Sequence, residues 1–271
     1  MNSPLGYAAW RAEHESVLES FPYKNVLLLY SGGKDSSVAM DFMCKAAKEF
    51  GFGFEAHAGA YPIHRYTDEE MKRLESYWQK RGVTVTWHDM GETDDYIKNA
   101  KNPCIPCQRL RKKVLKTSLM STIKDWESLV LVTCYTLWDI VSYSVERMLI
   151  GGFSNSDKES SDEKNRRFTE TAQRFYPLLK MKEGYTIFRP LIRYNNGDIL
   201  NLIAQEQIPV LSMPCEFGDF RPKRILEKYY AKMGMSFEYE QVFDFARSLL
   251  SLPNLSVFTQ MKKEEYLLDV F

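Results

Sequence analysis

The stretch Tyr-Ser-Gly-Gly-Lys-Asp-Ser at residues 30–36 most narrows the folds open to this chain. It follows the apolar run at 25–30, which is typical of a buried parallel strand, and precedes apolar residues at helical spacing over 36–49. Two adjacent glycines allow backbone conformations closed to other residues and let N–H groups approach an anion closely. A helix beginning near Ser36 adds unpaired N–H groups and the positive end of its dipole. The pattern predicts a strand–turn–helix unit that binds phosphate groups.

The side chains of this turn fit that role. Two serines supply hydroxyl donors, and Lys34 is the candidate for stabilising phosphate charge. Asp35 adds negative charge at a phosphate site, which makes sense if it holds Mg²⁺. A capped turn without a ligand is the alternative, and the spacing is not that of a Walker loop. The candidate nucleotide ligands are Ser31, Gly32, Gly33, Lys34, Asp35 and Ser36.

Strands and helices alternate along most of the chain. Apolar or alternating runs predict strands at 25–30, 52–60, 83–89, 128–135 and 185–192. Helical spacing predicts helices at 36–49, 67–81, 106–124, from 136 to about 150, and at 198–207. This order predicts an α/β fold, a doubly wound parallel five-stranded sheet with a helical C-terminal appendage. We expect a nucleotide-binding domain over 1–230 and a helical extension over 231–271.

The segment at 151–175 falls outside that rhythm, because it is polar, charged and rich in serine. It predicts a surface loop, with a substrate-gating lid as the alternative.

Charge and composition exclude several classes of protein. Acidic and basic residues number 36 each, which argues against coating nucleic acid by bulk charge but not against a local basic patch. No apolar run reaches the roughly 18 residues of a transmembrane helix. Residues 1–21 mix charges into a helical pattern without a signal-peptide core. We therefore expect a cytoplasmic protein with no membrane association.

The five cysteines point to metal or thiol chemistry, since an odd number of cysteines in a reducing compartment is poor evidence for disulfides. Cys104 and Cys107 form a C-x-x-C pair, which fits zinc, iron–sulfur or redox roles, and the basic residues after it favour the thiolate. Cys215, in a proline-flanked loop, is the third candidate ligand. Cys44 and Cys134 lie in apolar segments and are interpreted as packed thiols.

The motif Ser31–Ser36 resembles the SGGxDS motif of the PP-loop (HUP-like) ATP pyrophosphatases. The order of motifs along roughly residues 24–230 resembles the TtcA/TtuA group of tRNA thiolation enzymes. These motifs are the SGGxDS turn, C-x-x-C followed by Q-R-L-R, then F-R-P-L, and finally P-C. The resemblance implies AMP transfer from ATP with release of pyrophosphate. It also implies a [4Fe–4S] cluster held by Cys104, Cys107 and Cys215, with one iron free to carry sulfide.

One stretch departs from that family. The resemblance implies G-H-x-x-D-D after the fourth strand, whereas this chain has Cys-Tyr-Thr-Leu-Trp-Asp at 134–139. Asp139 alone stays in register; it serves magnesium or substrate on one interpretation and begins a helix on the other. Tyr135 and Trp138 would make that wall of the site aromatic. Arg189, in F-R-P-L, faces the nucleotide or lies on the surface at a strand end.

These features predict a sulfurtransferase that uses ATP, Mg²⁺ and a [4Fe–4S] cluster to replace a carbonyl oxygen by sulfur. The acceptor is a tRNA base or, alternatively, a free nucleobase or small metabolite that becomes a thioamide; a nucleotide sensor without turnover is the third reading. The sulfur donor is not named by the sequence, and monomer and homodimer both stay open. Basic residues behind both cysteine segments favour tRNA: Arg109, Arg111, Lys112, Lys113, Lys116, Arg221, Lys223 and Arg224.

Overall fold

Six strands form one sheet in the order β3-β2-β1-β4-β6-β5, and the computed structural model describes residues 5–149 and 168–267. The strands are β1 (Asn25–Leu29), β2 (Phe54–Gly59), β3 (Val85–His88), β4 (Leu129–Val132), β5 (Leu178–Lys180) and β6 (Thr186–Phe188). β1 pairs in parallel with both β2 and β4, and the parallel pairing continues to β3 on one side and β6 on the other. The predicted parallel sheet is therefore confirmed in these five strands.

β5 is a further strand that the sequence does not predict, and it pairs antiparallel with β6 at the sheet edge. A tight turn joins the two: the Met181 N–H donates to the Tyr185 carbonyl at 2.8 Å, and Gly184 has a φ of 91°. Each of these strands has only 3 residues, too few for an alternating pattern to stand out. The fifth predicted strand, 185–192, is correspondingly shorter than expected.

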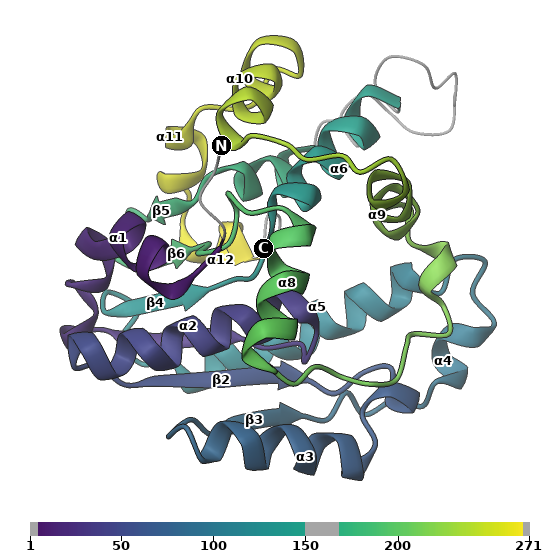
Figure 1. The fold of residues 1–271 in the computed structure, drawn as a ribbon, viewed down its shortest axis with the longest axis horizontal. Helices are drawn as coiled ribbons and strands as arrows, with labels where there is room; N and C mark the ends of the chain where they lie inside the picture. The colour runs from purple at the N-terminus through teal and green to yellow at the C-terminus, as the bar shows by residue number, and fades with distance from the viewer. Residues whose placement is uncertain (1–4, 150–167, 268–271) are drawn as a thin grey trace.

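Helices cover both faces of the sheet (Figure 1), and within the described ranges none is long and apolar enough to cross a membrane. The predicted helices are all present, within a few residues at each end. The predicted ones correspond to α2 (Lys34–Phe50), α3 (Asp68–Gln79), α5 (Cys104–Thr122), α6 (Leu137–Met148) and α8 (Asn196–Glu206). The structure also has α1 (Tyr7–Leu18), α4 (Asp95–Lys98), α9 (Pro222–Lys232), α10 (Tyr239–Leu249), α11 (Leu255–Thr259) and α12 (Lys263–Glu265), with 3₁₀ turns η1 (Phe21–Tyr23), η2 (Ile63–Arg65), η4 (Gln173–Phe175) and η5 (Gly218–Phe220).

Successive residues of the central strands enter two different cores. Val26 and Leu28 of β1 belong to the core beneath α1, α2, α3 and α8, whereas Leu27 belongs to the core beneath α5, α6 and the C-terminal helices. The helices that follow β1 and β4 therefore cover opposite faces. The sheet has its topological switch point between the carboxyl ends of these two strands, where open α/β sheets bind ligands.

The described C-terminal segment shares the second core. Tyr239, Ala246 and Phe258 belong to the same buried cluster as Leu131 of β4. The predicted helical appendage is confirmed, and the division at residue 230 stays a prediction.

Part of the predicted loop at 151–175 is ordered helix. Residues 151–167 lie outside the described residues, but 168–172 are helical and continue into η4. Phe168, Ala172 and Phe175 are buried in the second core. The prediction of a polar surface loop is therefore wrong for this part, because its few apolar residues recur at helical spacing and find a core.

Candidate functional site

The glycine-rich turn joins β1 to α2 at the carboxyl edge of the sheet. Gly32 has a φ of 65°, in the left-handed region that glycine tolerates best. Gly33 is the N-cap of α2, and no side chain caps this helix. The turn is held from within, because Ser36 Oγ accepts the Ser31 N–H at 3.1 Å and donates to the Gly33 carbonyl at 3.0 Å. An uncapped helix N-terminus beside a fixed turn is what a phosphate site requires.

The segment before Cys215 is fixed to this turn. The Leu211 N–H donates to the Gly32 carbonyl at 2.7 Å. A Cβ on Gly32 would lie 2.8 Å from Leu211 Cγ, so these groups already touch. On the other side, the Tyr66 hydroxyl donates to the Ser31 carbonyl at 2.9 Å. The turn and the loop that carries Cys215 therefore form one unit.

Gly32→Ala is expected to lower the free energy of unfolding by about 2–5 kcal/mol and to remove ATP binding. The left-handed conformation costs an L-residue about 1–2 kcal/mol, and overpacking against Leu211 adds about 1–3 kcal/mol. Gly51→Ala is the matched control, because Gly51 has a φ of 72° but no atom within 4 Å of the added Cβ. Urea unfolding and calorimetric titration with ATP measure both effects. Equal stability losses in the two variants would show that Leu211 does not pack on the turn.

Two lysine–aspartate pairs meet at the switch point. Lys34 Nζ contacts Asp35 Oδ1 at 2.6 Å, and Lys223 of α9 pairs with Asp139 of α6. Burial opposes the charge of Asp139, yet the nearby Lys223 holds the pKa of this carboxyl below its usual value, and Lys34 adds to the effect. Burial likewise opposes the charge of Lys223, but Asp139 and then Asp35 raise its pKa above the usual value. All four groups are thus electrostatic neighbours, and Lys223 and Asp139 are held in their charged forms.

Asp139 acts as a helix cap and an anchor. Its Oδ2 accepts the Thr136 N–H at 2.9 Å and the Thr136 hydroxyl at 3.1 Å, and its Oδ1 contacts Lys223. The side chain is only 3% exposed. Because each oxygen already has a partner, the contacts favour the helix-terminal interpretation over a magnesium ligand.

The structure corrects the prediction that Lys223 is a surface residue. The sequence places it with the basic surface residues that follow Cys215, but its side chain is 18% exposed and points to Asp139 and Glu227. The lysine is half-buried because it pairs with Asp139 of α6, a contact between distant segments that the spacing of residues in the sequence cannot reveal. It is the main site residue whose role the sequence misses.

Arg189 lies in the core. It is 1% exposed, and its guanidinium donates to the Tyr176 carbonyl at 2.8 Å and to the Gln173 side chain. These bonds tie the end of β6 to η4. We therefore do not retain Arg189 as a nucleotide ligand: the F-R-P-L arginine fixes the scaffold.

The predicted aromatic wall is only half present. Trp138 is 3% exposed and donates its indole N–H to Asn195 at 3.1 Å, so it is a core residue and the prediction is wrong for it. Tyr135 is half-buried, with the Arg174 guanidinium 5.0 Å from its ring centre.

Three of the cysteines are electrostatic neighbours. Cys104 and Cys107 lie in the first turn of α5, and a charge on Cys215 would act on both of them. Among residues 5–149 and 168–267, no three His, Cys, Asp or Glu side chains lie close enough to hold a single metal ion. The donor set still suits a [4Fe–4S] cluster, since its thiolates bind different irons and stand farther apart than the ligands of one zinc.

Arginines from two segments act on the charge of these thiols. Burial raises the pKa of Cys104 and of Cys107, with Arg221 and Arg111 respectively opposing it. Burial therefore outweighs the predicted effect of the basic residues, and the free thiols are protonated. A bound metal would have to displace these protons, after which the arginines offset the negative charge of the thiolates.

His64 and Asp94 hold the Cys215 loop, and the sequence does not single them out. His64 Nε2 accepts the Glu216 N–H at 3.2 Å, so its Nδ1 carries the proton and donates to Asp94 at 2.8 Å. Asp94 also accepts the Ile63 N–H at 2.7 Å. Burial opposes its charge, but the hydrogen bonds from His64 and Ile63 lower the pKa of Asp94 below its usual value. Three segments distant in sequence are joined one residue from Cys215.

α3 holds the same loop from the other side. Glu70 accepts the Ser212 N–H at 2.9 Å, and Arg73 donates to the Val210 carbonyl at 2.7 Å. The hydrogen bond from Arg73, with that from Ser212, lowers the pKa of Glu70 to about 2 although burial opposes it.

Glu70→Gln is expected to lower the free energy of unfolding by about 1–3 kcal/mol at pH 7. The pKa of Glu70 is lower in the folded protein than its usual value of 4.5. Its contribution to the free energy of unfolding is therefore fully present above pH 4.5 and is lost as the pH falls toward 2. The difference between wild type and variant, followed by urea unfolding from pH 6 to pH 3, should therefore shrink. Glu69→Gln, at an exposed neighbour, is the control. A difference that does not change with pH would contradict this account.

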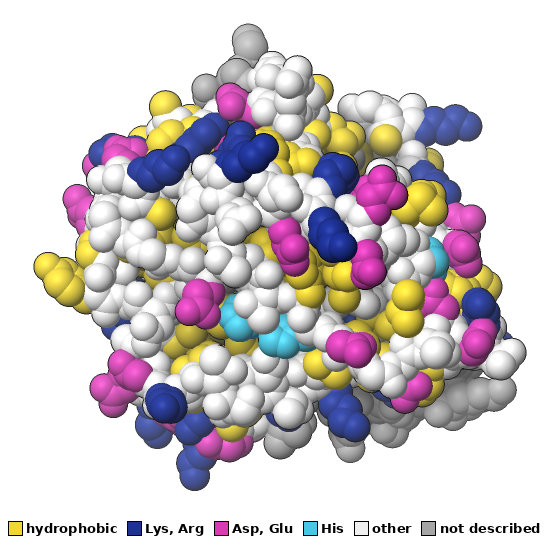
Figure 2. All heavy atoms as spheres, turned by 90° about the horizontal axis from the view of Figure 1, so that it is seen from below, with side chains coloured by type: hydrophobic (Ala, Val, Ile, Leu, Met, Phe, Trp, Pro, Cys, Tyr) yellow, Lys and Arg dark blue, Asp and Glu magenta, His cyan; other side chains and the backbone are white. Residues whose placement is uncertain are grey.

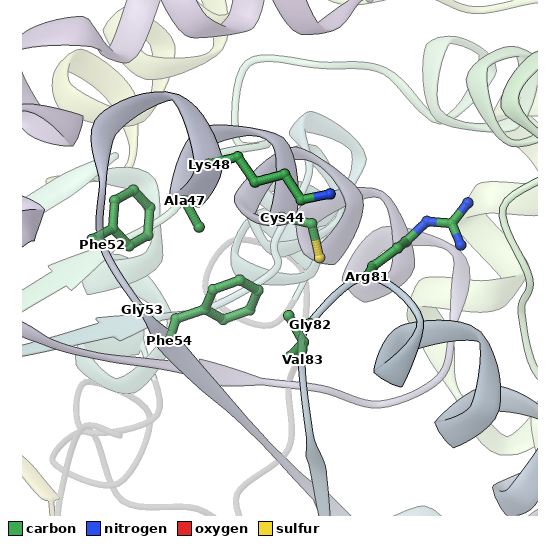
Figure 3. Close-up of a pocket in the computed structure, with 9 residues that line it drawn as sticks. All are labelled: Cys44, Ala47, Lys48, Phe52, Gly53, Phe54, Arg81, Gly82 and Val83. Carbon is green, nitrogen blue, oxygen red and sulfur yellow. The ribbon is translucent and has the colours of Figure 1, made fainter.

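A cavity of about 240 Å³ lies elsewhere, at the C-terminal end of α2, the start of β2 and the residues just before β3 (Figure 3). It is at the opposite edge of the sheet from the glycine-rich turn. Cys44 lines it and is 5% exposed, and burial raises the pKa of this thiol to about 12. This supports the interpretation of Cys44 as a packed thiol. Cys134 lies instead near Asp35 and Asp139, where burial and these charges raise its pKa.

Comparison with solved structures supports this fold. No family model matches the chain, and no curated protein matches it. The structure of the U34-tRNA thiolase NcsA from Methanococcus maripaludis with its [4Fe-4S] cluster is similar, with a TM-score of 0.60 and 15% identity over 92% of this chain and 81% of that one.

Two synthetases are less similar. They are NMN synthetase from Francisella tularensis (TM-score 0.45, 13% identity, 93% of this chain and 92% of that one) and NH3-dependent NAD synthetase from Campylobacter jejuni (TM-score 0.41, 12% identity, 97% and 96%). We infer nothing further from them. At 15% identity the likeness to the thiolase is one of fold: this chain has an α/β fold similar to that of the thiolase, as the resemblance of its glycine-rich turn to the PP-loop motif implies.

Proposed function

We propose that this protein is an ATP-dependent sulfurtransferase that activates a carbonyl oxygen with AMP and replaces it by sulfur. One observation carries the proposal: the loop that holds Cys215 is hydrogen-bonded to the phosphate-binding turn through Leu211 and Gly32, at 2.7 Å. A nucleotide site and a three-thiol site fixed to each other suit an enzyme that activates an acceptor and delivers sulfur to it. The similar structure of the thiolase with its [4Fe-4S] cluster supports the same function.

The turn binds the nucleotide. The backbone N–H groups at the start of α2 and the hydroxyl of Ser31 receive the phosphates, and Lys34 offsets the negative charge that develops on pyrophosphate. Asp35, whose carboxylate is half-buried beside Lys34, is the group proposed to bring Mg²⁺ to the phosphates. Positioning and charge stabilisation are the main work of such a site.

The thiols of Cys104, Cys107 and Cys215 are the proposed ligands of a [4Fe–4S] cluster. When bound, the cluster would supply sulfide for the activated carbon. The protein fixes the three cysteines through the first turn of α5 and through the contacts of His64 and Glu70 with the Cys215 loop. All five cysteines are free, which suits a reducing compartment, and we propose the cytoplasm.

A tRNA base is the proposed acceptor. α5 begins with two of the cysteines, and exposed basic side chains follow on the same helix: Arg109, Lys112 and Lys113. Arg221, also exposed, adds a charge beside Cys104. On the face below α3 and β3, by contrast, acidic and basic side chains are interspersed (Figure 2). A local concentration of positive charge at the thiols is what an RNA backbone would recognise.

Binding of tRNA at varied salt tests this proposal. Arg109→Glu with Lys113→Glu is expected to weaken binding of an unmodified tRNA transcript at least tenfold at 100 mM salt and to flatten the salt dependence. Lys72→Glu with Lys80→Glu, at exposed lysines on α3 and at its C-cap, is the charge-matched control. Fluorescence anisotropy measures both. Thiolation of a free nucleobase, with no tRNA affinity at low salt, would favour the small-metabolite alternative.

A further inference from the structure

Lys223 occupies the position where the proposed reaction needs positive charge. It is the second residue of α9, and its Nζ contacts Asp139 and lies 3.5 Å from Glu227. Asp139 follows β4, whereas Asp35 follows β1, so the ammonium lies at the crevice between the two strand ends. Phosphates bound at the start of α2 would enter the same crevice.

The contacts leave Lys223 able to bind a further anion. An ammonium has three N–H donors. Among the residues described, Lys223 has two carboxylate partners, Asp139 and Glu227, so one N–H is left for a further anion. Asp35 and Lys34 belong to the same group of charges, so five charged side chains surround the site: Lys34, Asp35, Asp139, Lys223 and Glu227.

Without Lys223, three carboxylates would face Lys34 alone. Such a group would repel pyrophosphate, which carries several negative charges. With Lys223 in place, both oxygens of Asp139 have partners, so this carboxylate does not need a cation from solution. The built-in ammonium therefore serves where a metal ion would otherwise be needed.

We propose that Lys223 is a pyrophosphate-binding residue, an ammonium held by Asp139 and Glu227 at the carboxyl ends of β1 and β4, and that it replaces a metal ion at Asp139. This inference rests on the proposed function. It explains why a lysine from a distant helix is drawn into a half-buried site. It also gives Asp139 a positioning role, because Asp139 acts on the phosphates only through Lys223.

The alternative is that Lys223 only neutralises Asp139. Lys223→Met removes the ammonium and leaves the buried carboxylate unpaired, so a loss of binding in this variant alone has two explanations. The double variant Lys223→Met with Asp139→Asn separates them, because the amide keeps an acceptor for Thr136 but needs no counter-charge. Lys228→Met is the control on the same helix, since Lys228 is exposed and pairs with exposed Asp219.

Calorimetric titration with inorganic pyrophosphate and Mg²⁺, together with thermal unfolding, decides between them. Lys223→Met is expected to lower the melting temperature and to weaken pyrophosphate binding about 10–100-fold. The double variant should regain the melting temperature but not the binding, while Lys228→Met binds like wild type. A double variant that binds pyrophosphate as tightly as wild type overturns the inference and leaves the proposed function standing. Wild-type protein that binds neither ATP nor pyrophosphate overturns both.

Discussion

Anaerobically isolated protein is expected to hold about four irons per chain, and Cys107→Ser almost none. Cys107 lies in the first turn of α5 with Cys104, and a charge on Cys215 would act on both. A cluster that loses one of three thiolates keeps too few bonds to stay attached, because the serine hydroxyl is a poor ligand for iron at neutral pH. Iron and sulfide analysis and the optical absorption spectrum measure the loss.

Cys44→Ser is the matched control for this prediction. The chemical change is the same, but Cys44 lies in the core beside the cavity of Figure 3, at the other edge of the sheet. It should keep its iron even though a buried hydroxyl costs about 1–3 kcal/mol of stability. Stoichiometric zinc without iron after reconstitution, or iron retained by Cys107→Ser, would refute the cluster assignment.

Asp35→Asn is expected to lower magnesium-dependent ATP cleavage about 10²–10³-fold while the fold stays intact. The carboxylate contacts Lys34 at 2.6 Å and stabilises Lys223, so it is the negative group of the turn nearest to both cations. The amide keeps the shape but cannot hold Mg²⁺ as an anion does. Single-turnover kinetics at several Mg²⁺ concentrations measure the effect.

Glu69→Gln serves again as a control, because its carboxylate is exposed on α3. If Asp35→Asn cleaved ATP at the wild-type rate at every Mg²⁺ concentration, Asp35 would have no part in metal binding.

Local patterns in the sequence predict most of the fold. The apolar runs of β1 and β4 and the glycines at 32–33 each carry their signal within a few residues. The C-x-x-C pair is equally local, because Cys104 and Cys107 need only one helical turn to face the same way. β5, and with it the hairpin to β6, escapes prediction, since a 3-residue strand is too short to show a period.

The electrostatics of the site depend on contacts between distant segments. Lys223 resembles its basic neighbours in sequence and differs only because α9 turns it toward Asp139. Arg189 is a plausible ligand by motif, yet Gln173 and Tyr176 bind it in the core. His64 reaches Glu216 across the fold. Such pairings follow from tertiary packing, which a single sequence does not encode in any local spacing.

The products of ATP cleavage test the central claim most directly. The protein, reconstituted anaerobically, is incubated with Mg²⁺, an unmodified tRNA transcript and ATP labelled at the γ-phosphate. A turn that binds pyrophosphate and lacks Walker spacing predicts that the label appears in pyrophosphate, with an equal amount of AMP. Label that appears in orthophosphate, with ADP as the other product, would contradict the account.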